Sequence, residues 1–225
     1  LKMKKTMDGL ASGERVEITA TDPGFPRDAA AWCNSTGNQL ISKETAGGKS
    51  VVVIEKGEPK SCNIVTSCEG KGKTFIMFSD DLDKALATFV LANGAAATGQ
   101  KVTIFFTFWG LNVIKKLHKP NVEKDIFGKM FGMMLPSSSR KLKLSKMSMG
   151  GIGGKMMRYI MNRKGIDSLE SLRQQALENG VEFIACQMSM DVMGVKQEEL
   201  LDEVTIGGVA TYMERADNAN INLFI

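Results

Sequence analysis

The chain has little histidine, little cysteine and no long apolar run, and each shortage excludes a class of protein. Only one of its 225 residues is histidine, His118, which argues against a histidine-rich metal site and against a His-based catalytic triad. The four cysteines, Cys33, Cys62, Cys68 and Cys186, are too few and too scattered for a disulfide scaffold. No run of about 18 or more apolar residues is present, so the sequence predicts no membrane-spanning helix.

The bulk composition is that of an ordinary soluble globular protein. Hydrophobic residues make up 43% and charged residues 24% of the chain. The formal net charge of +4 is too small to indicate a nucleic-acid partner. Because the thiols do not form a scaffold, we expect them to be reduced and the protein to be cytoplasmic. The first residue is Leu1 rather than methionine, which indicates a piece of a longer polypeptide.

The first 57 residues have the pattern of a small α/β domain. Apolar residues recur at helical spacing in two stretches and alternate in three, which predicts the order αβαββ. The predicted elements are a helix over Lys2–Leu10, a strand over Arg15–Ala20, a helix over Arg27–Thr36, and strands over Gln39–Thr45 and Val51–Glu55. Residues 58–73 lack periodicity and are rich in Gly, Lys, Ser and Glu, so we interpret them as a linker.

Residues 74–225 alternate between strand and helix patterns. The apolar runs Thr74–Phe78, Val102–Phe108 and Val181–Ala185 predict strands, and the runs that predict helices are Leu82–Ala97, Leu169–Leu177, Gln187–Met193, Lys196–Glu203 and Gly208–Asp217. Asp167 is expected to cap the second of these helices, and Ile221–Ile225 to form a last strand. A strand that is apolar on both faces belongs to a parallel sheet covered by helices. The sequence therefore predicts an open, mostly parallel α/β sheet with helices on both faces.

An insertion at about residues 126–166 interrupts this alternation. It holds nine basic residues and no acidic one, and it is rich in methionine and glycine. Such a segment suits an acidic partner, an anionic thiol cofactor or a membrane surface. A solvated loop whose methionines pack in an oligomer interface is the interpretation we favour.

Cys186 is the candidate for chemistry. It ends a predicted strand, and a predicted helix follows it, so it lies at the carboxyl edge of the sheet, where open α/β proteins bind ligands. The N–H groups that begin a helix favour the thiolate, which is the form that attacks sulfur. The alternative is an inert buried cysteine. Cys62 and Cys68 have five residues between them, unlike a Cys-x-x-Cys zinc pair, and are expected to form a resolving disulfide or a plain loop pair.

Two stretches carry a family resemblance. The segment Gly180–Gly194, Gly-Val-Glu-Phe-Ile-Ala-Cys-Gln-Met-Ser-Met-Asp-Val-Met-Gly, resembles the active-site segment of the DsrE/DsrF family of sulfurtransferase-like proteins. The runs Thr74–Ser79, Gly207–Tyr212 and Asn222–Ile225 fit the same family. The resemblance implies that Cys186 accepts sulfur.

The front of the chain resembles a TusA-type sulfur carrier. Ala20–Pro23, Arg27-Asp28, Trp32-Cys33 and Gln39–Thr45 carry this resemblance. Such carriers bear sulfur on the first cysteine of a Cys-Pro-x-Pro motif at the start of their first helix. Here that motif would lie just upstream of Leu1 and is absent, so the TusA-like part is not expected to carry sulfur as given. Cys33 matches a second cysteine position. The two modules together resemble the tail of a larger polypeptide with a flavin-dependent disulfide reductase and a rhodanese.

The predicted function is therefore intracellular sulfur relay. Cys186 carries sulfur as a persulfide, with no metal and no organic cofactor, and its partners are sulfur donor and acceptor proteins or low-molecular-weight thiols. A homo-oligomer is expected, because the family assembles and the insertion offers apolar surface. The alternative is a non-catalytic docking or oligomerisation module of a flavin-dependent disulfide reductase.

Overall fold

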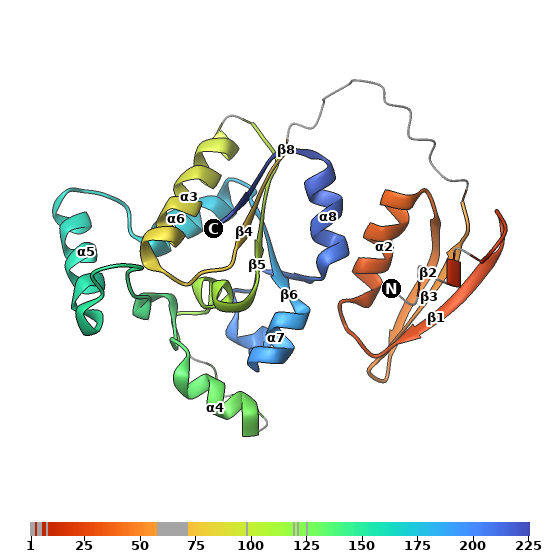
Figure 1. Ribbon diagram of the computed structural model, residues 1–225, viewed down its shortest axis with the longest axis horizontal. Coiled ribbons are helices and arrows are strands. Elements are labelled where there is room, and N and C mark those ends of the chain that lie inside the picture. The colour runs from red at the N-terminus through yellow and green to blue at the C-terminus, as the bar shows by residue number, and fades with distance from the viewer. Residues whose placement is uncertain are drawn as a thin grey trace. The chain divides into compact units, whose positions relative to one another are not determined.

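The computed structural model describes residues 3, 6–7, 9–57, 72–97, 99–118, 120, 122–124 and 126–225. They form two compact units (Figure 1). The first contains a three-stranded sheet with its helix, together with the segment Gly207–Asp217, and the second contains a five-stranded sheet with its helices. Most of the predicted linker, including Cys62 and Cys68, lies outside the described residues.

The first unit is a two-layer α/β structure. Its elements are β1 (Arg15–Ala20), α2 (Phe25–Thr36), β2 (Gln39–Ala46) and β3 (Lys49–Glu55). β3 lies in the centre and pairs antiparallel with both neighbours. Side chains alternate along β3, so Val52 and Ile54 are buried and pack with Met7, Ala29 and Cys33 in one core. The helix predicted over Lys2–Leu10 falls partly outside the described residues.

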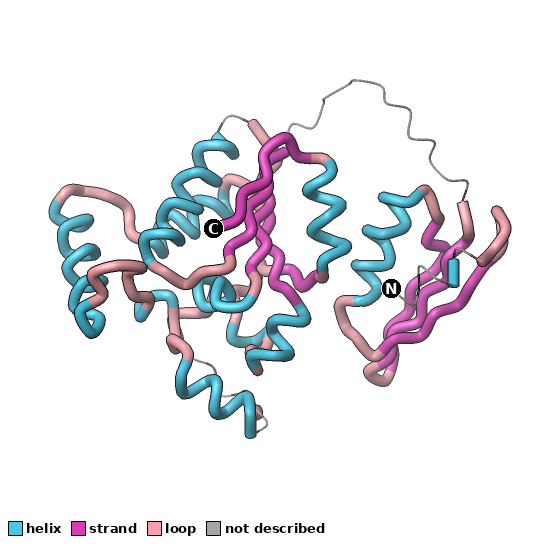
Figure 2. The backbone as a smooth tube through the Cα atoms, in the orientation of Figure 1, coloured by secondary structure: helices cyan, strands magenta, loops and turns pink. Residues whose placement is uncertain are grey.

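The second unit is built on a mostly parallel sheet (Figure 2). Its strands, in the order in which they lie in the sheet, are β7 (Thr205–Gly207), β6 (Glu182–Cys186), β5 (Val102–Phe106), β4 (Gly72–Met77) and β8 (Ala219–Phe224). β4 runs parallel to β5 and to β8, and β5 runs parallel to β6. α8 (Val209–Asp217) groups with the first unit by its contacts.

The central strand of the sheet, β5, lies in the hydrophobic core of the second unit. All five residues of β5 are buried, as its apolar run predicts. α3 (Leu82–Ala97) and α6 (Leu169–Glu178) lie side by side and contribute Phe89 and Ala176 to the same core cluster (Figure 1). There the rings of Phe106 and Phe183 are 5.3 Å apart, edge to face, which is a favourable aromatic geometry. The predicted α/β class with a mostly parallel sheet is confirmed.

The insertion contains two helices rather than one long loop. Its elements are α4 (Ile126–Met134), η2 (Ser139–Lys141), η3 (Met149–Gly151) and α5 (Ile152–Arg163), where η marks a 3-10 helix. α4 and α5 stand away from the sheet and apart from each other (Figure 1). Within the described residues, no helix has both the length and the apolarity needed to cross a membrane.

Two local predictions are wrong. The helix expected over Lys196–Glu203 is only a 3-10 turn, η4 (Gln197–Glu199), because the backbone that follows it forms an antiparallel bridge between Leu200 and Lys115 instead of continuing a helix. The N-cap of α6 is Ser168 rather than Asp167, since the Ser168 hydroxyl accepts from Ser171 N. In the first case a contact between residues far apart in the chain overrides local helical spacing.

Candidate functional site

Cys186 ends β6 and is the N-cap residue of α7 (Gln187–Met193). Phe183 and Ala185 of the same strand belong to the core cluster, so the alternation of side chains directs Cys186 to the other face. Its thiol is free but only 3% exposed, and it makes no capping hydrogen bond to α7. The predicted strand-end position is confirmed, whereas ready access to solvent is not a property of this conformation.

A buried pair of hydroxyl groups lies at the same junction. Thr107 Oγ1 and Ser189 Oγ are 2.8 Å apart, and either can be the donor. Thr107 follows β5 directly, and Ser189 is in the first turn of α7 with no exposed surface. Neither residue stands out in the sequence. The available signal was that each hydroxyl residue has an apolar residue directly on either side.

A second polar pair lies past the end of β4. Asn112, in η1 (Phe108–Ile114), is completely buried and its Nδ2 donates to Asp80 Oδ2 at 2.9 Å. Asn112 Oδ1 is buried without a hydrogen-bond partner. Burial raises the pKa of Asp80, and the hydrogen bond from Asn112 offsets only part of that rise. The Asp80 carboxyl group therefore takes up a proton more readily than an exposed aspartate.

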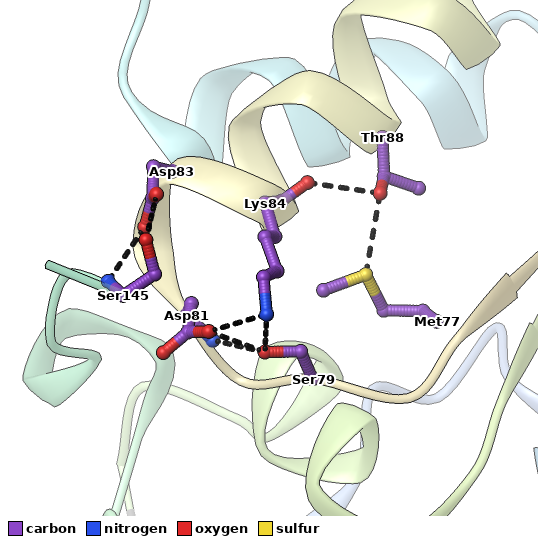
Figure 3. Close-up of polar contacts among 7 residues, drawn as sticks. All are labelled: Met77, Ser79, Asp81, Asp83, Lys84, Thr88 and Ser145. Carbon is purple, nitrogen blue, oxygen red and sulfur yellow. Dashed lines mark hydrogen bonds and ion pairs between the residues drawn. The ribbon is translucent and has the colours of Figure 1, made fainter. Parts of the chain in front are cut away.

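Hydrogen bonds join the insertion to the first turn of α3. Asp83 accepts hydrogen bonds from the backbone N and the Oγ of Ser145, at 2.9 and 2.5 Å, and beside it Lys84 pairs with Asp81 at 2.8 Å (Figure 3). Burial raises the pKa of Asp83, but the two hydrogen bonds from Ser145 outweigh it and the pKa lies below its ordinary value. The contact is therefore charge-assisted at neutral pH.

A cavity of about 760 Å³ opens at this edge of the sheet. Its lining combines carboxylates, ammonium groups and apolar side chains, among them Asp80, Asp81, Trp109, Met133, Lys141 and Lys143. Among the described residues that line it, Cys186 does not appear. The cavity and the Cys186 thiol thus lie at the same edge of the sheet, but Cys186 is not among the described residues that line the cavity.

α4 packs on the end of α7 through two glycines. Gly194 ends α7 with a positive φ of 60°, and a Cβ placed on it meets Gly128 Cα at 2.4 Å. The two backbones approach this closely only because neither residue has a side chain. Further along α4, Met133 and Met134 are 88% and 76% exposed. The helix after Cys186 therefore contacts a helix that carries exposed methionines.

The remaining cysteine described by the structure is unsuited to chemistry. Cys33 is 2% exposed in the core of the first unit, and burial raises its pKa to about 11. Within the described residues, no group of three or more His, Cys, Asp or Glu is arranged to hold a metal ion.

Family models match both parts of the chain. The model described as the DsrE/DsrF/DrsH-like family matches residues 70–224, and the model described as sulfurtransferase TusA matches residues 1–56. The chain therefore belongs to the DsrE/DsrF/DrsH-like family, and it carries an N-terminal TusA domain.

Individual relatives agree with this assignment. The chain is 44% identical over 155 residues to an uncharacterized protein, YrkE, of Bacillus subtilis, which is 69% of this chain and 97% of YrkE. It is 38% identical over 161 residues to the sulfur carrier protein DsrE2 of Allochromatium vinosum, which is 70% of this chain and 99% of that protein. The sulfur carrier protein TusA of the same organism is 39% identical over 56 residues, 25% of this chain and 74% of that protein. The names of the two Allochromatium vinosum proteins support a role in sulfur relay.

Proposed function

We propose that this protein carries sulfur as a persulfide on Cys186 and passes it to an acceptor thiol. The observation that carries the proposal is the position of Cys186, a free thiol at the carboxyl end of a parallel strand, in a chain related to named sulfur carriers. Ligands of open α/β sheets bind at this edge. The partners are sulfur donor and acceptor proteins or low-molecular-weight thiols.

The relay needs only thiol chemistry. The Cys186 thiolate attacks the outer sulfur of a donor persulfide, R–S–SH, forming Cys–S–SH and breaking the donor S–S bond, so that R–S⁻ leaves. An acceptor thiolate then attacks the outer sulfur on Cys186, and the Cys186 thiolate is regenerated. Each step conserves charge and sulfur oxidation state, and neither requires a metal or an organic cofactor.

Because Cys186 is buried, sulfur relay requires the structure around Cys186 to open locally. A thiol that is 3% exposed meets a donor only when the junction of β6 and α7 opens locally. Because α7 is held by α4 through Gly128 and Gly194, we propose that movement of α4 admits the donor. The proposed division of the chain remains a TusA domain at 1–57, a linker at 58–73 and a DsrE-like domain at 74–225.

Intact-protein mass spectrometry after brief incubation with polysulfide tests the proposal. We expect an added sulfur mass on the Cys186 peptide, removable by a reductant and absent from the Cys186→Ser variant. Cys33→Ser is the matched control, because it removes a buried thiol with a raised pKa, and it should load sulfur like the unmodified chain. Unchanged loading of Cys186→Ser refutes the relay.

A docking module is the second candidate, favoured by the burial of Cys186 and by the exposed methionines of α4. In this function the chain docks or oligomerises a larger flavin-dependent disulfide reductase, and Cys186 is inert. Alkylation of the native protein separates the two: a Cys186 that never reacts at neutral pH favours docking. Homo-oligomer formation and a cytoplasmic location stay predictions, to be measured by analytical ultracentrifugation and by cell fractionation.

A further inference from the structure

A second cavity lies in the unit that contains the five-stranded sheet, and it is lined by parts of the insertion and by the start of α6. Its volume is about 700 Å³. Sites for small organic molecules typically have volumes of about 300 to 1,000 Å³. Cys186 is not among the described residues that line this cavity, so the proposed sulfur relay gives the cavity no role.

Two guanidinium groups line this second cavity. The side chain of Arg158, in α5, is 24% exposed; its Nη2 donates to Ser139 O at 2.9 Å, and its Nη1 lies 3.5 Å from Glu170 Oε2. Arg140, in η2, is exposed, and its side chain makes no hydrogen bond or ion pair within the described residues. Because each guanidinium group has five N–H donors, most donors of this pair are available to a ligand.

The two guanidinium groups are close enough to repel each other. Burial lowers the pKa of Arg158, the carboxylate of Glu170 raises it, and the positive charge of Arg140 lowers it again. The net change is downward, so the ion pair with Glu170 offsets the other two effects only in part. An anion in the cavity would therefore stabilise both guanidinium groups.

The two carboxylates that line the cavity already have partners within the chain. Glu170 accepts a hydrogen bond from Ser139 Oγ at 2.9 Å, in addition to its ion pair. Asp167 accepts hydrogen bonds from Ser171 Oγ at 2.9 Å and from Gln175 Nε2 at 3.1 Å. Among the described residues, no ion pair joins either carboxylate to the exposed guanidinium group, which leaves that group for a ligand.

The start of α6 and apolar side chains complete the lining. The N–H groups of Leu169 and Glu170, the first two residues of α6, have no partner within the helix. They add partial positive charge, which favours a phosphate group at the start of a helix. The buried side chains of Leu82 and Met161 give the cavity an apolar wall. The lining therefore suits a molecule with an anionic group and an apolar part.

We propose that this cavity binds a small molecule that carries a phosphate group on an apolar body, with the phosphate held between Arg140 and Arg158. The planar fork of a guanidinium group matches the spacing of phosphate oxygens, and a phosphate has enough oxygens to accept from two such groups. The proposal goes beyond sulfur relay, because the site does not include Cys186 and its occupancy does not depend on thiol chemistry.

The first experiment is isothermal titration calorimetry of the unmodified chain with phenyl phosphate as the probe. Inorganic phosphate lacks the apolar body, phenol lacks the anion, and benzoate replaces the phosphate by a carboxylate. We expect phenyl phosphate to bind at least about tenfold more tightly than each of the three. Equal binding of inorganic phosphate or benzoate, or no binding of phenyl phosphate, overturns the proposal.

The second experiment locates the site with single substitutions. Arg140→Ala should weaken binding by about tenfold, because it removes charge-assisted hydrogen bonds, and it leaves the fold intact because the side chain makes none within the described residues. Arg163→Ala is the matched control: it removes the same charge from α5, but Arg163 is not among the described residues that line the cavity. Equal weakening by the two substitutions shows attraction by net charge alone and overturns the proposal.

A third variant tests the position of the phosphate. Glu170→Gln should tighten binding, because it removes the negative charge that competes for Arg158 and keeps an oxygen that can accept from Ser139. The backbone amide resonances of Leu169 and Glu170 should shift on addition of phenyl phosphate, as measured by nuclear magnetic resonance. Unchanged affinity in Glu170→Gln, or amide shifts that leave out the start of α6, would refute binding at this place.

Discussion

Replacing Gly194 by alanine tests how firmly α4 holds the helix that follows Cys186. The added Cβ causes two separate costs. Gly194 has a φ of 60°, in the left-handed region, where an L-residue is less stable by about 1 to 2 kcal/mol. The Cβ also meets Gly128 Cα at 2.4 Å, and separating two packed backbones costs about 1 to 3 kcal/mol more.

Gly180→Ala is the matched control. Gly180 follows α6 with a φ of 77°, and a Cβ placed there has nothing within 4 Å. Its substitution costs only the left-handed strain, about 1 to 2 kcal/mol, while Gly194→Ala costs about 2 to 5 kcal/mol in total. The gain from a less flexible unfolded chain is common to both and cancels in the comparison.

Urea unfolding gives the free energy of each variant, and alkylation of Cys186 gives the functional consequence. Gly194→Ala should lose at least about 1 kcal/mol more than Gly180→Ala, the low end of the packing cost. It should also alkylate Cys186 faster, because displacement of α4 loosens α7. Equal losses in the two variants would refute the close contact between α4 and α7.

Three further predictions follow from single sites. Cys33, with a pKa raised to about 11 by burial, should resist alkylation at neutral pH in the native protein and react after unfolding, and rapid native labelling contradicts its burial. The pKa of Asp83 is lower in the folded state than in the unfolded state, where it is about 3.9. The hydrogen bonds that the Asp83 carboxylate accepts from Ser145 should therefore be complete above about pH 3.9, and they should be lost as the pH falls through the lower folded-state pKa. Hydrogen exchange of the Ser145 amide measures this, and Asp83→Asn should raise that exchange at neutral pH. Ser168→Ala should cost about 1 kcal/mol of unfolding free energy by urea denaturation, because it removes the N-cap of α6; an unchanged value would rule out that cap.

The local pattern of apolar residues was sufficient to predict the main strands of the sheet. The apolar run from Val102 could be assigned to a buried parallel strand, because a strand covered on both faces has no polar side. The alternation of strands and helices gave the α/β class, and Cys186 could be assigned to a strand end because the next residues have helical spacing. These features depend on residues that are close together in the chain, so the order of residues in the sequence is enough to predict them.

Pattern failed where distant residues decide the local structure. Lys196–Glu203 has helical spacing, yet the backbone bridge between Leu200 and Lys115 leaves only a 3-10 turn. The bond between Thr107 and Ser189 joins residues 82 positions apart, and no periodicity connects them. The Gly194 contact likewise depends on where α4 lies, which the spacing within α4 does not specify.

The sequence by itself determined the α/β class, the resemblance to two sulfur-carrier families and the place of Cys186 at a strand end, because these follow from local periodicity and residue identity. Only the tertiary structure decided the 3% exposure of Cys186, its neighbours and the helix that restrains α7. The physical reason is that burial and hydrogen bonding of a side chain depend on every element that packs around it. Those elements come from parts of the chain far apart in sequence.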